Sequence, residues 1–179
     1  LAIMLVNEGD EGFNDWEERR TKRMKIANIL LEHPDLNTHM IDRQGYSMLA
    51  LACSGDPQPE IVSALIAKGA NVNHIRTTGP DAVNESVLMT FFSKLTYSAD
   101  KESFSEVFKI LLKSGAAVNM IDGNGRSVWE YLIVKITDYI INTESSTNIL
   151  HHLSSMMIRF GARVGQSEAY DRIPHNDDR

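Results

Sequence analysis

The chain has 179 residues, the length of one ordinary domain, and its 42% apolar and 23% charged residues are typical of a globular protein rather than a disordered one. Its formal net charge of −6 argues against a general nucleic-acid binder, and its longest apolar runs, such as Leu1 to Val6, are far shorter than the roughly 18 residues of a membrane span. The single cysteine, Cys53, excludes an internal disulfide bond and any zinc site built from several cysteines.

The first helix with a legible start is predicted at Asp15. Asp15 and Glu18 have the spacing of a capping box, which satisfies free N–H groups of a first helical turn. A basic cluster follows on the same helix: Arg19, Arg20, Lys22, Arg23 and Lys25. The i, i+4 pair of Glu18 and Lys22 favours an exposed helix face, and the alternative is a patch for an acidic partner.

A hairpin is predicted next, at residues 40–47, because their pattern M-I-D-x-x-G-x-S returns at residues 120–127. Ser47 stands where its oxygen accepts from the first turn of a following helix. Another helix is expected to begin at Pro59, which suits a first helical position, and to stop at Gly69, which tolerates a left-handed conformation.

The same order then repeats twice. A weaker copy of the hairpin pattern at residues 74–79 is followed by five extra residues before Ser86, which indicates a widened loop and a new helix start. Ser103 with Glu106 has capping-box spacing, and Ser127 opens a further helix. Residues 166–179 are polar and without periodicity, so we expect them to be loosely held.

The repeated apolar segments are unevenly spaced. Ile26 and Ile61 are 35 residues apart, whereas Ile61 and Val107, and then Val107 and Leu153, are 46 residues apart. We expect the surplus to lengthen the helices, or the turns between them, in the last two units.

These patterns resemble the ankyrin repeat, in which G-x-S-x-L opens one helix and a segment such as I-V-x-L-L-L-x-x-G-A-x-V-N closes the next. The resemblance is strongest at residues 69–73 and 115–119. It implies an all-α fold, an ankyrin-type helical repeat solenoid with short hairpin loops between helix pairs. The implied units are approximately 1–38, 39–73, 74–119 and 120–165, with 166–179 as a tail, and the chain would start inside the first helix of a unit.

The resemblance is divergent. The T-P-L-H core of the family is absent from all three opening helices, which removes its histidine hydrogen bonds between units. The small alanines of a regular array are replaced by large residues, which should alter the local spacing and curvature: Phe91, Phe92, Leu132 and Ile133.

The same register bears on catalysis. It places Cys53 at a packed helix position, which predicts a buried, inert thiol; the alternative is a nucleophile assisted by a histidine elsewhere. His151 and His152 are adjacent and so point in different directions, and residues 123–125 are better explained as a hairpin turn than as a nucleotide loop. We therefore expect no enzyme activity, no cofactor and no metal site.

In the family, partners bind a groove formed by the hairpin fingers and the inner sides of the first helices. Transferred to this sequence, the partner-binding positions are Ile41, Arg43, Gln44, Tyr46, Ile75, Thr77, Thr78, Ile121, Asn124 and Arg126. The isoleucines form a row that either contacts a partner or packs between fingers, whereas Tyr46 and Arg126 are expected to be contacts. Trp129 is expected in the core.

The expected function is noncatalytic binding of a partner protein or peptide by a cytoplasmic monomer, with neither nucleic acid nor a membrane span involved. The alternative is the targeting domain of a larger enzyme or bacterial effector whose catalytic domain lies outside these residues, which would act in the host cytoplasm.

Overall fold

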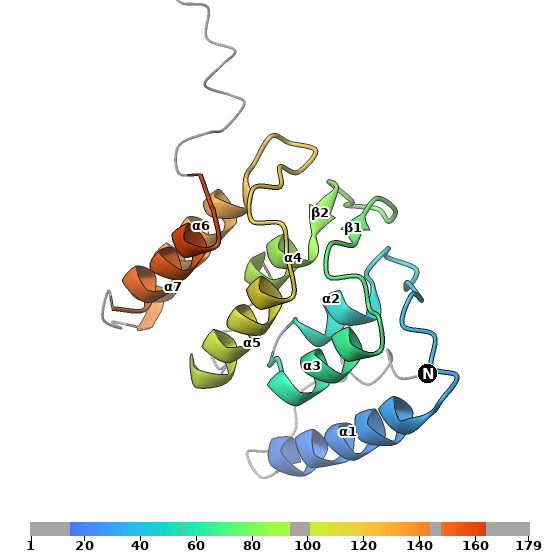
Figure 1. Ribbon diagram of the computed structural model, residues 1–179. Helices are drawn as coiled ribbons and strands as arrows, with labels where there is room; N and C mark the ends of the chain where they lie inside the picture. The colour runs from blue at the N-terminus through green and yellow to red at the C-terminus, as the bar shows by residue number, and fades with distance from the viewer. Residues whose placement is uncertain (1–14, 55, 94–100, 144–147, 164–179) are drawn as a thin grey trace, which may run out of the picture.

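The protein is a stack of helices, described here by a computed structural model for residues 15–54, 56–93, 101–143 and 148–163 (Figure 1). The helices are α1 (Asp15–Glu32), α2 (Met48–Ala52), α3 (Pro59–Ala67), α4 (Val87–Ser93), α5 (Lys101–Lys113), α6 (Val128–Thr143) and α7 (Asn148–Arg159). Two short antiparallel strands, β1 (Ile75–Arg76) and β2 (Glu85–Ser86), pair in the second hairpin. The expected all-α repeat solenoid with hairpin loops is confirmed.

The helices form two rows. In the inner row α2 contacts α4 and α4 contacts α6, while in the outer row α1, α3, α5 and α7 contact one another in that order. Each repeating unit therefore supplies a hairpin, an inner helix and an outer helix. The helix expected at residues 1–6 and the tail 166–179 lie outside the described residues.

The predicted helix starts are largely confirmed. Ser47 Oγ accepts from the Ala50 N–H at 3.1 Å, and Ser86 and Ser127 accept in the same way at 3.3 Å from the N–H groups three residues on. Helix α1 begins at Asp15 and α3 at Pro59, as expected. The start predicted at Ser103 is wrong, because α5 begins at Lys101; residues three apart are also neighbours inside a helix, so the Ser-x-x-Glu spacing is ambiguous.

The outer helices end as predicted. Gly69, Gly115 and Gly161 follow α3, α5 and α7 with φ angles of 87°, 86° and 86°. The expected lengthening is confirmed for α6, which has 16 residues against five in α2. The helix that opens at Ser86 is described only as far as Ser93, because residues 94–100 lie outside the described residues, so the lengthening expected there stays a prediction.

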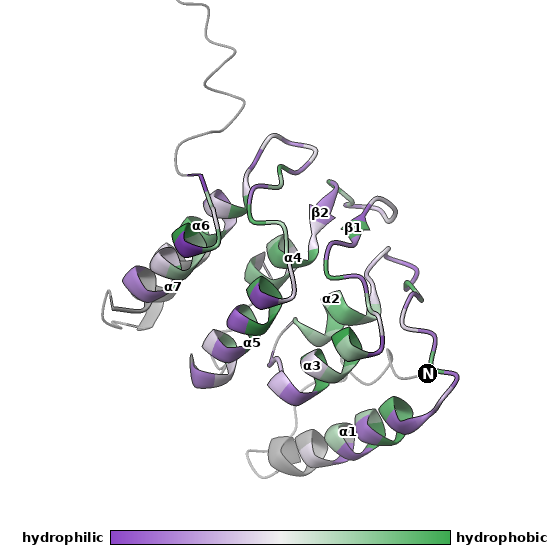
Figure 2. Cartoon of the chain, in the orientation of Figure 1, coloured by the Kyte–Doolittle hydropathy of each residue, from purple (hydrophilic) through white to green (hydrophobic). Residues whose placement is uncertain are grey.

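Aromatic side chains fill the space between α4 and α5. Phe91 stacks on Phe104 with ring centroids 4.4 Å apart, and Phe92 meets Phe108 edge to face at 5.4 Å. Figure 2 shows that α2 and α4 are apolar along their length, whereas hydrophilic residues are interspersed along α5 and α7. The large residues that replace the small alanines of a regular array thus build this part of the core.

Two further core predictions are confirmed. Cys53 is fully buried, at 1% exposure, and Trp129 packs partly buried against the core. Burial raises the pKa of the Cys53 thiol, because the interior disfavours the thiolate. A buried thiol that stays protonated is a poor nucleophile, which favours the inert thiol over the nucleophilic alternative.

Candidate functional site

Three hairpin fingers project side by side from the same edge of the stack (Figure 1). We call residues 40–47 the first finger, 75–86 the second and 120–127 the third. In each finger an isoleucine pairs across the hairpin with the serine that caps the next inner helix: Ile41 with Ser47, Ile75 with Ser86, and Ile121 with Ser127. The fingers are thus continuous with the starts of α2, α4 and α6.

An aspartate closes the first and the third finger. Asp42 Oδ1 accepts from the N–H groups of Gln44 and Tyr46 at 2.9 and 2.8 Å. Asp122 Oδ1 accepts from the N–H groups of Asn124 and Arg126, also at 2.9 and 2.8 Å. The hairpin turn predicted at residues 123–125 is confirmed, and the aspartate of the M-I-D pattern serves as the turn's internal acceptor.

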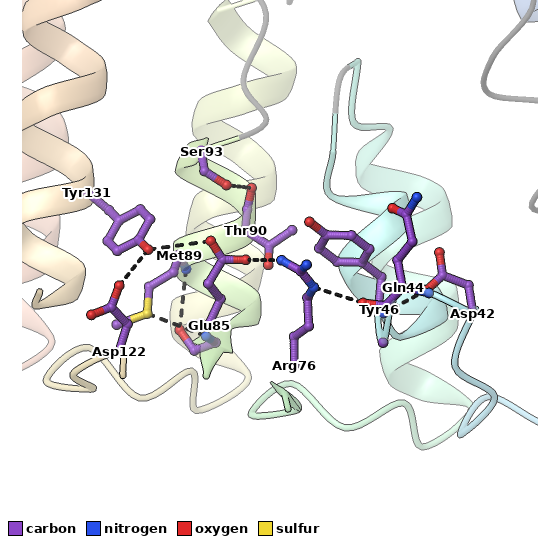
Figure 3. A network of polar contacts seen from close by, with 12 residues as sticks. Asp42, Gln44, Tyr46, Arg76, Glu85, Met89, Thr90, Ser93, Asp122 and Tyr131 are labelled. Carbon is purple, nitrogen blue, oxygen red and sulfur yellow. Dashed lines mark hydrogen bonds and ion pairs between the residues drawn. The ribbon is translucent and has the colours of Figure 1, made fainter. Parts of the chain in front are cut away.

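The second finger has Arg76 where the other two have aspartate. Its guanidinium Nη1 lies 2.9 Å from Glu85 Oε2, and the two side chains are 6% and 12% exposed (Figure 3). Arg76 Nε donates to the Gln44 carbonyl oxygen at 2.8 Å, and the guanidinium lies 4.4 Å from the centroid of the Tyr46 ring. Arg76 therefore joins the second finger to the first by a hydrogen bond and a cation–π contact.

A tyrosine of α6 joins the second finger to the third. Tyr131 Oη donates to Asp122 Oδ2 at 2.8 Å and lies 3.4 Å from Glu85 Oε1 (Figure 3). Arg126 Nη2 donates to the same Tyr131 oxygen at 2.8 Å, and Arg126 Nε donates to Asp122 Oδ2 at 3.0 Å. Charges of alternating sign thus run from Arg76 through Glu85 to Arg126 and Asp122.

The surroundings of Asp122 keep it ionised. Burial by itself would raise its pKa, but hydrogen bonds from the Arg126 N–H, the Tyr131 hydroxyl, the Arg126 guanidinium and the Asn124 N–H outweigh burial and lower the pKa. Burial, with the adjacent carboxylates, raises the pKa of Tyr131, which therefore stays a neutral donor.

The backbones of the fingers also touch. Gly45 has a φ angle of 84°, and a Cβ atom there would collide with the Thr78 carbonyl oxygen. A Cβ atom on Gly79 would lie 2.5 Å from the Gln44 carbonyl oxygen. On the other side, the Gly123 N–H donates to the Val83 carbonyl oxygen. The widened loop of the second finger, residues 77–84, therefore rests against both neighbours.

Most of the predicted partner-binding residues lie at the surface of the fingers. Arg43, Gln44, Thr77, Thr78, Asn124 and Arg126 are exposed. Of the isoleucine row, Ile41 is 50% exposed, whereas Ile75 and Ile121 are partly buried. The row is therefore not uniformly available to a partner.

Tyr46 corrects the expectation of a surface contact. It is 6% exposed and lies against the Arg76 guanidinium, so it belongs to the base of the fingers. Its position in the pattern does not reveal this burial, because the covering residue comes from the next unit.

Sequence reasoning also missed three residues of the site. Met40 is 53% exposed beside Ile41, while Glu85 and Tyr131 connect the fingers from within. The signal for Glu85 was present: an arginine stands where the other two copies have aspartate, and a buried arginine requires an acidic partner.

Other candidate sites are less organised. Lys22 and Lys25 of the basic cluster are exposed, and the side chains of the cluster's arginines lie outside the described residues. His152 Nε2 lies 3.2 Å from Ser105 Oγ on an exposed surface. Across the described ranges, no three histidine, cysteine or acidic side chains gather as metal ligands, and no helix combines the length and apolarity needed to cross a bilayer.

Comparison with known proteins supports the repeat pattern. The ankyrin repeat family model matches residues 44–77, which run from the first finger through α2 and α3 to the second finger. No curated protein matches the sequence. An ankyrin repeat domain from Acinetobacter baumannii AYE has a similar structure, with 20% identity and a TM-score of 0.56 over 80% of this chain. The alignment spans 61% of that domain's chain, and at this identity it shows a shared fold alone.

Proposed function

This chain is an ankyrin repeat protein, and from that premise we propose that it is a noncatalytic interaction module that binds a partner protein or peptide on its finger row. Ankyrin repeats are in general protein-interaction modules. By finger row we mean the exposed residues of the three fingers, which form the partner-facing surface in this proposal.

The observation that carries the proposal is that the fingers are locked at their bases and exposed at their tips. Arg76 holds the second finger to the first through Gln44 and Tyr46. Tyr131 beside Glu85, and the Gly123 N–H that donates to the Val83 carbonyl oxygen, hold the second finger to the third. A surface that is already ordered loses less conformational entropy when a partner binds, so more of the contact energy appears as affinity.

The composition of the tips also suits binding. Met40 and Ile41 expose apolar surface beside Arg43, and Arg126 is exposed at the opposite end of the row. Apolar anchors combined with arginine are typical of the residues that dominate the energetics of protein interfaces.

The proposal is tested by capture from cell lysate on the immobilised chain, followed by calorimetric titration of the captured partner. Ile41→Asp should weaken binding by about 2 kcal/mol, roughly 30-fold, because it places a charge in the apolar part of the row. Ile158→Asp is the matched control, since Ile158 is 55% exposed on α7, away from the fingers. Equal binding by the wild type and Ile41→Asp, or a loss confined to Ile158→Asp, would place the interface elsewhere.

A further inference from the structure

The two exposed arginines of the finger row differ in whether their guanidinium groups already form hydrogen bonds within the protein. Arg126 is bound to Asp122 and Tyr131 by hydrogen bonds of 2.8 to 3.0 Å. Arg43, on the tip of the first finger, is exposed and has no hydrogen bond or ion pair with the described part of the chain. Its guanidinium donors are therefore available to a ligand, whereas those of Arg126 are largely used within the protein.

The neighbouring carboxylate does not neutralise Arg43. Asp42 directs Oδ1 at two backbone N–H groups of its own turn and forms no ion pair with Arg43. The same fingertip exposes about half of Met40 and half of Ile41, so an apolar surface and an unpaired cation lie on one short hairpin.

The charge changes along the row. The second finger exposes Asp81 in its widened loop and has no exposed cation, because Arg76 is buried against Glu85. The same finger exposes Thr77 and Thr78, and the third finger exposes Asn124, all of which offer hydrogen bonds without charge. A long acidic run would therefore be repelled at Asp81, although a single carboxylate fits at Arg43.

Resting on the proposed function, we propose that the first finger is the anchor of the site and binds an extended peptide segment in which an apolar side chain is flanked by one aspartate or glutamate. The carboxylate pairs with Arg43, and the apolar side chain packs on Met40 and Ile41. The rest of the segment crosses the second and third fingers without a further acidic residue.

The length of the segment follows from the stack. Packed helices lie about 8–10 Å apart, so the first and third fingers, two units apart, are separated by about 16–20 Å. An extended chain rises about 3.3 Å per residue, which makes the crossing about five to six residues long.

The test selects random 12-residue peptides displayed on phage against the immobilised full chain, and then titrates the enriched peptides in solution. The enriched sequences should share one carboxylate beside an apolar residue. Arg43→Gln should lower the affinity for these peptides about tenfold, the loss expected for one charge-assisted hydrogen bond. Lys109→Gln, which removes the same charge from an exposed position on α5, is the matched control and should leave affinity unchanged. Raising the salt concentration should weaken the wild type more than Arg43→Gln.

The outcomes separate this inference from the proposed function. Suppose that the enriched peptides share no carboxylate, lose binding to Ile41→Asp, and bind Arg43→Gln as tightly as the wild type. That result would overturn the acidic anchor and leave the finger row as the binding face. Enrichment of acidic runs or basic sequences would also overturn it. A selection in which no enriched peptide depends on Ile41 or Arg43 would overturn both.

Discussion

The helix stack and the finger row of this protein are held together by different forces. Between the helices, apolar side chains such as Phe91, Phe108 and Leu111 are fully buried, and burial of apolar surface is non-directional. Between the fingers, the contacts are directional: hydrogen bonds, a cation–π contact and backbone approaches that depend on single atoms. The stack therefore sets whether the chain folds, and the fingers set the shape of the surface that a partner meets.

The finger row shows a second difference, between its two ion pairs. Arg76 and Glu85 are both largely buried, whereas Arg126 is 51% exposed although its partner Asp122 is fully covered. Removing one member of a buried pair leaves an uncompensated charge in the interior. When a solvent-exposed arginine is removed, water can take over part of its interaction with the remaining carboxylate. Replacing the arginine should therefore lower the free energy of unfolding more in the Arg76–Glu85 pair than in the Arg126–Asp122 pair.

The largest expected effect is in the stack. Phe91→Ala removes the ring that stacks on Phe104 and should lower the free energy of unfolding by about 3–5 kcal/mol, measured by urea denaturation. Ile29→Ala is the control, because Ile29 is exposed on α1 and its truncation should change stability by less than about 0.5 kcal/mol. Similar losses for both variants would contradict the division between core and surface.

The next effect compares the ion pairs. Arg76→Met keeps the length of the side chain but leaves the Glu85 carboxylate without its cation, and should cost about 3 kcal/mol. Arg126→Met should cost about 1 kcal/mol, since Asp122 keeps its hydrogen bonds from Asn124 and Tyr131. Denaturation of the two variants side by side measures the difference, and a reversed order would show that burial does not control these pairs.

The smallest expected effect isolates the contact between fingers. Gly45→Ala and Gly125→Ala introduce the same left-handed strain, at φ angles of 84° and 81°, worth about 1–2 kcal/mol. Gly45→Ala should cost about 1 kcal/mol more, because its methyl group would collide with Thr78, whereas open space surrounds Gly125. Amide hydrogen exchange should also speed up in residues 77–84 for Gly45→Ala alone; equal exchange in both variants would argue against the close approach.

Much of the fold was predictable from local chemistry. The serines before α2, α4 and α6 and the glycines after α3, α5 and α7 act on backbone groups a few residues away, so their effect is visible in the sequence. The prediction failed at Ser103, where the same spacing occurs within a helix. It failed again at Tyr46, which is covered by a residue 30 positions further along the chain.

By itself, the sequence determined the repeat, the order of hairpin and helices, and the turns closed by Asp42 and Asp122, because each of these depends on contacts within a few residues. The tertiary structure alone decided which finger residues are exposed and which form bonds to other residues of the protein. Arg76 and Glu85 face each other across the second finger, whereas Tyr131 comes from the next unit, and only stacking brings it within bonding distance of Glu85. That stacking covers Tyr46 and leaves Arg43 exposed without a partner among the described residues, because charge and exposure at a surface depend on such long-range neighbours.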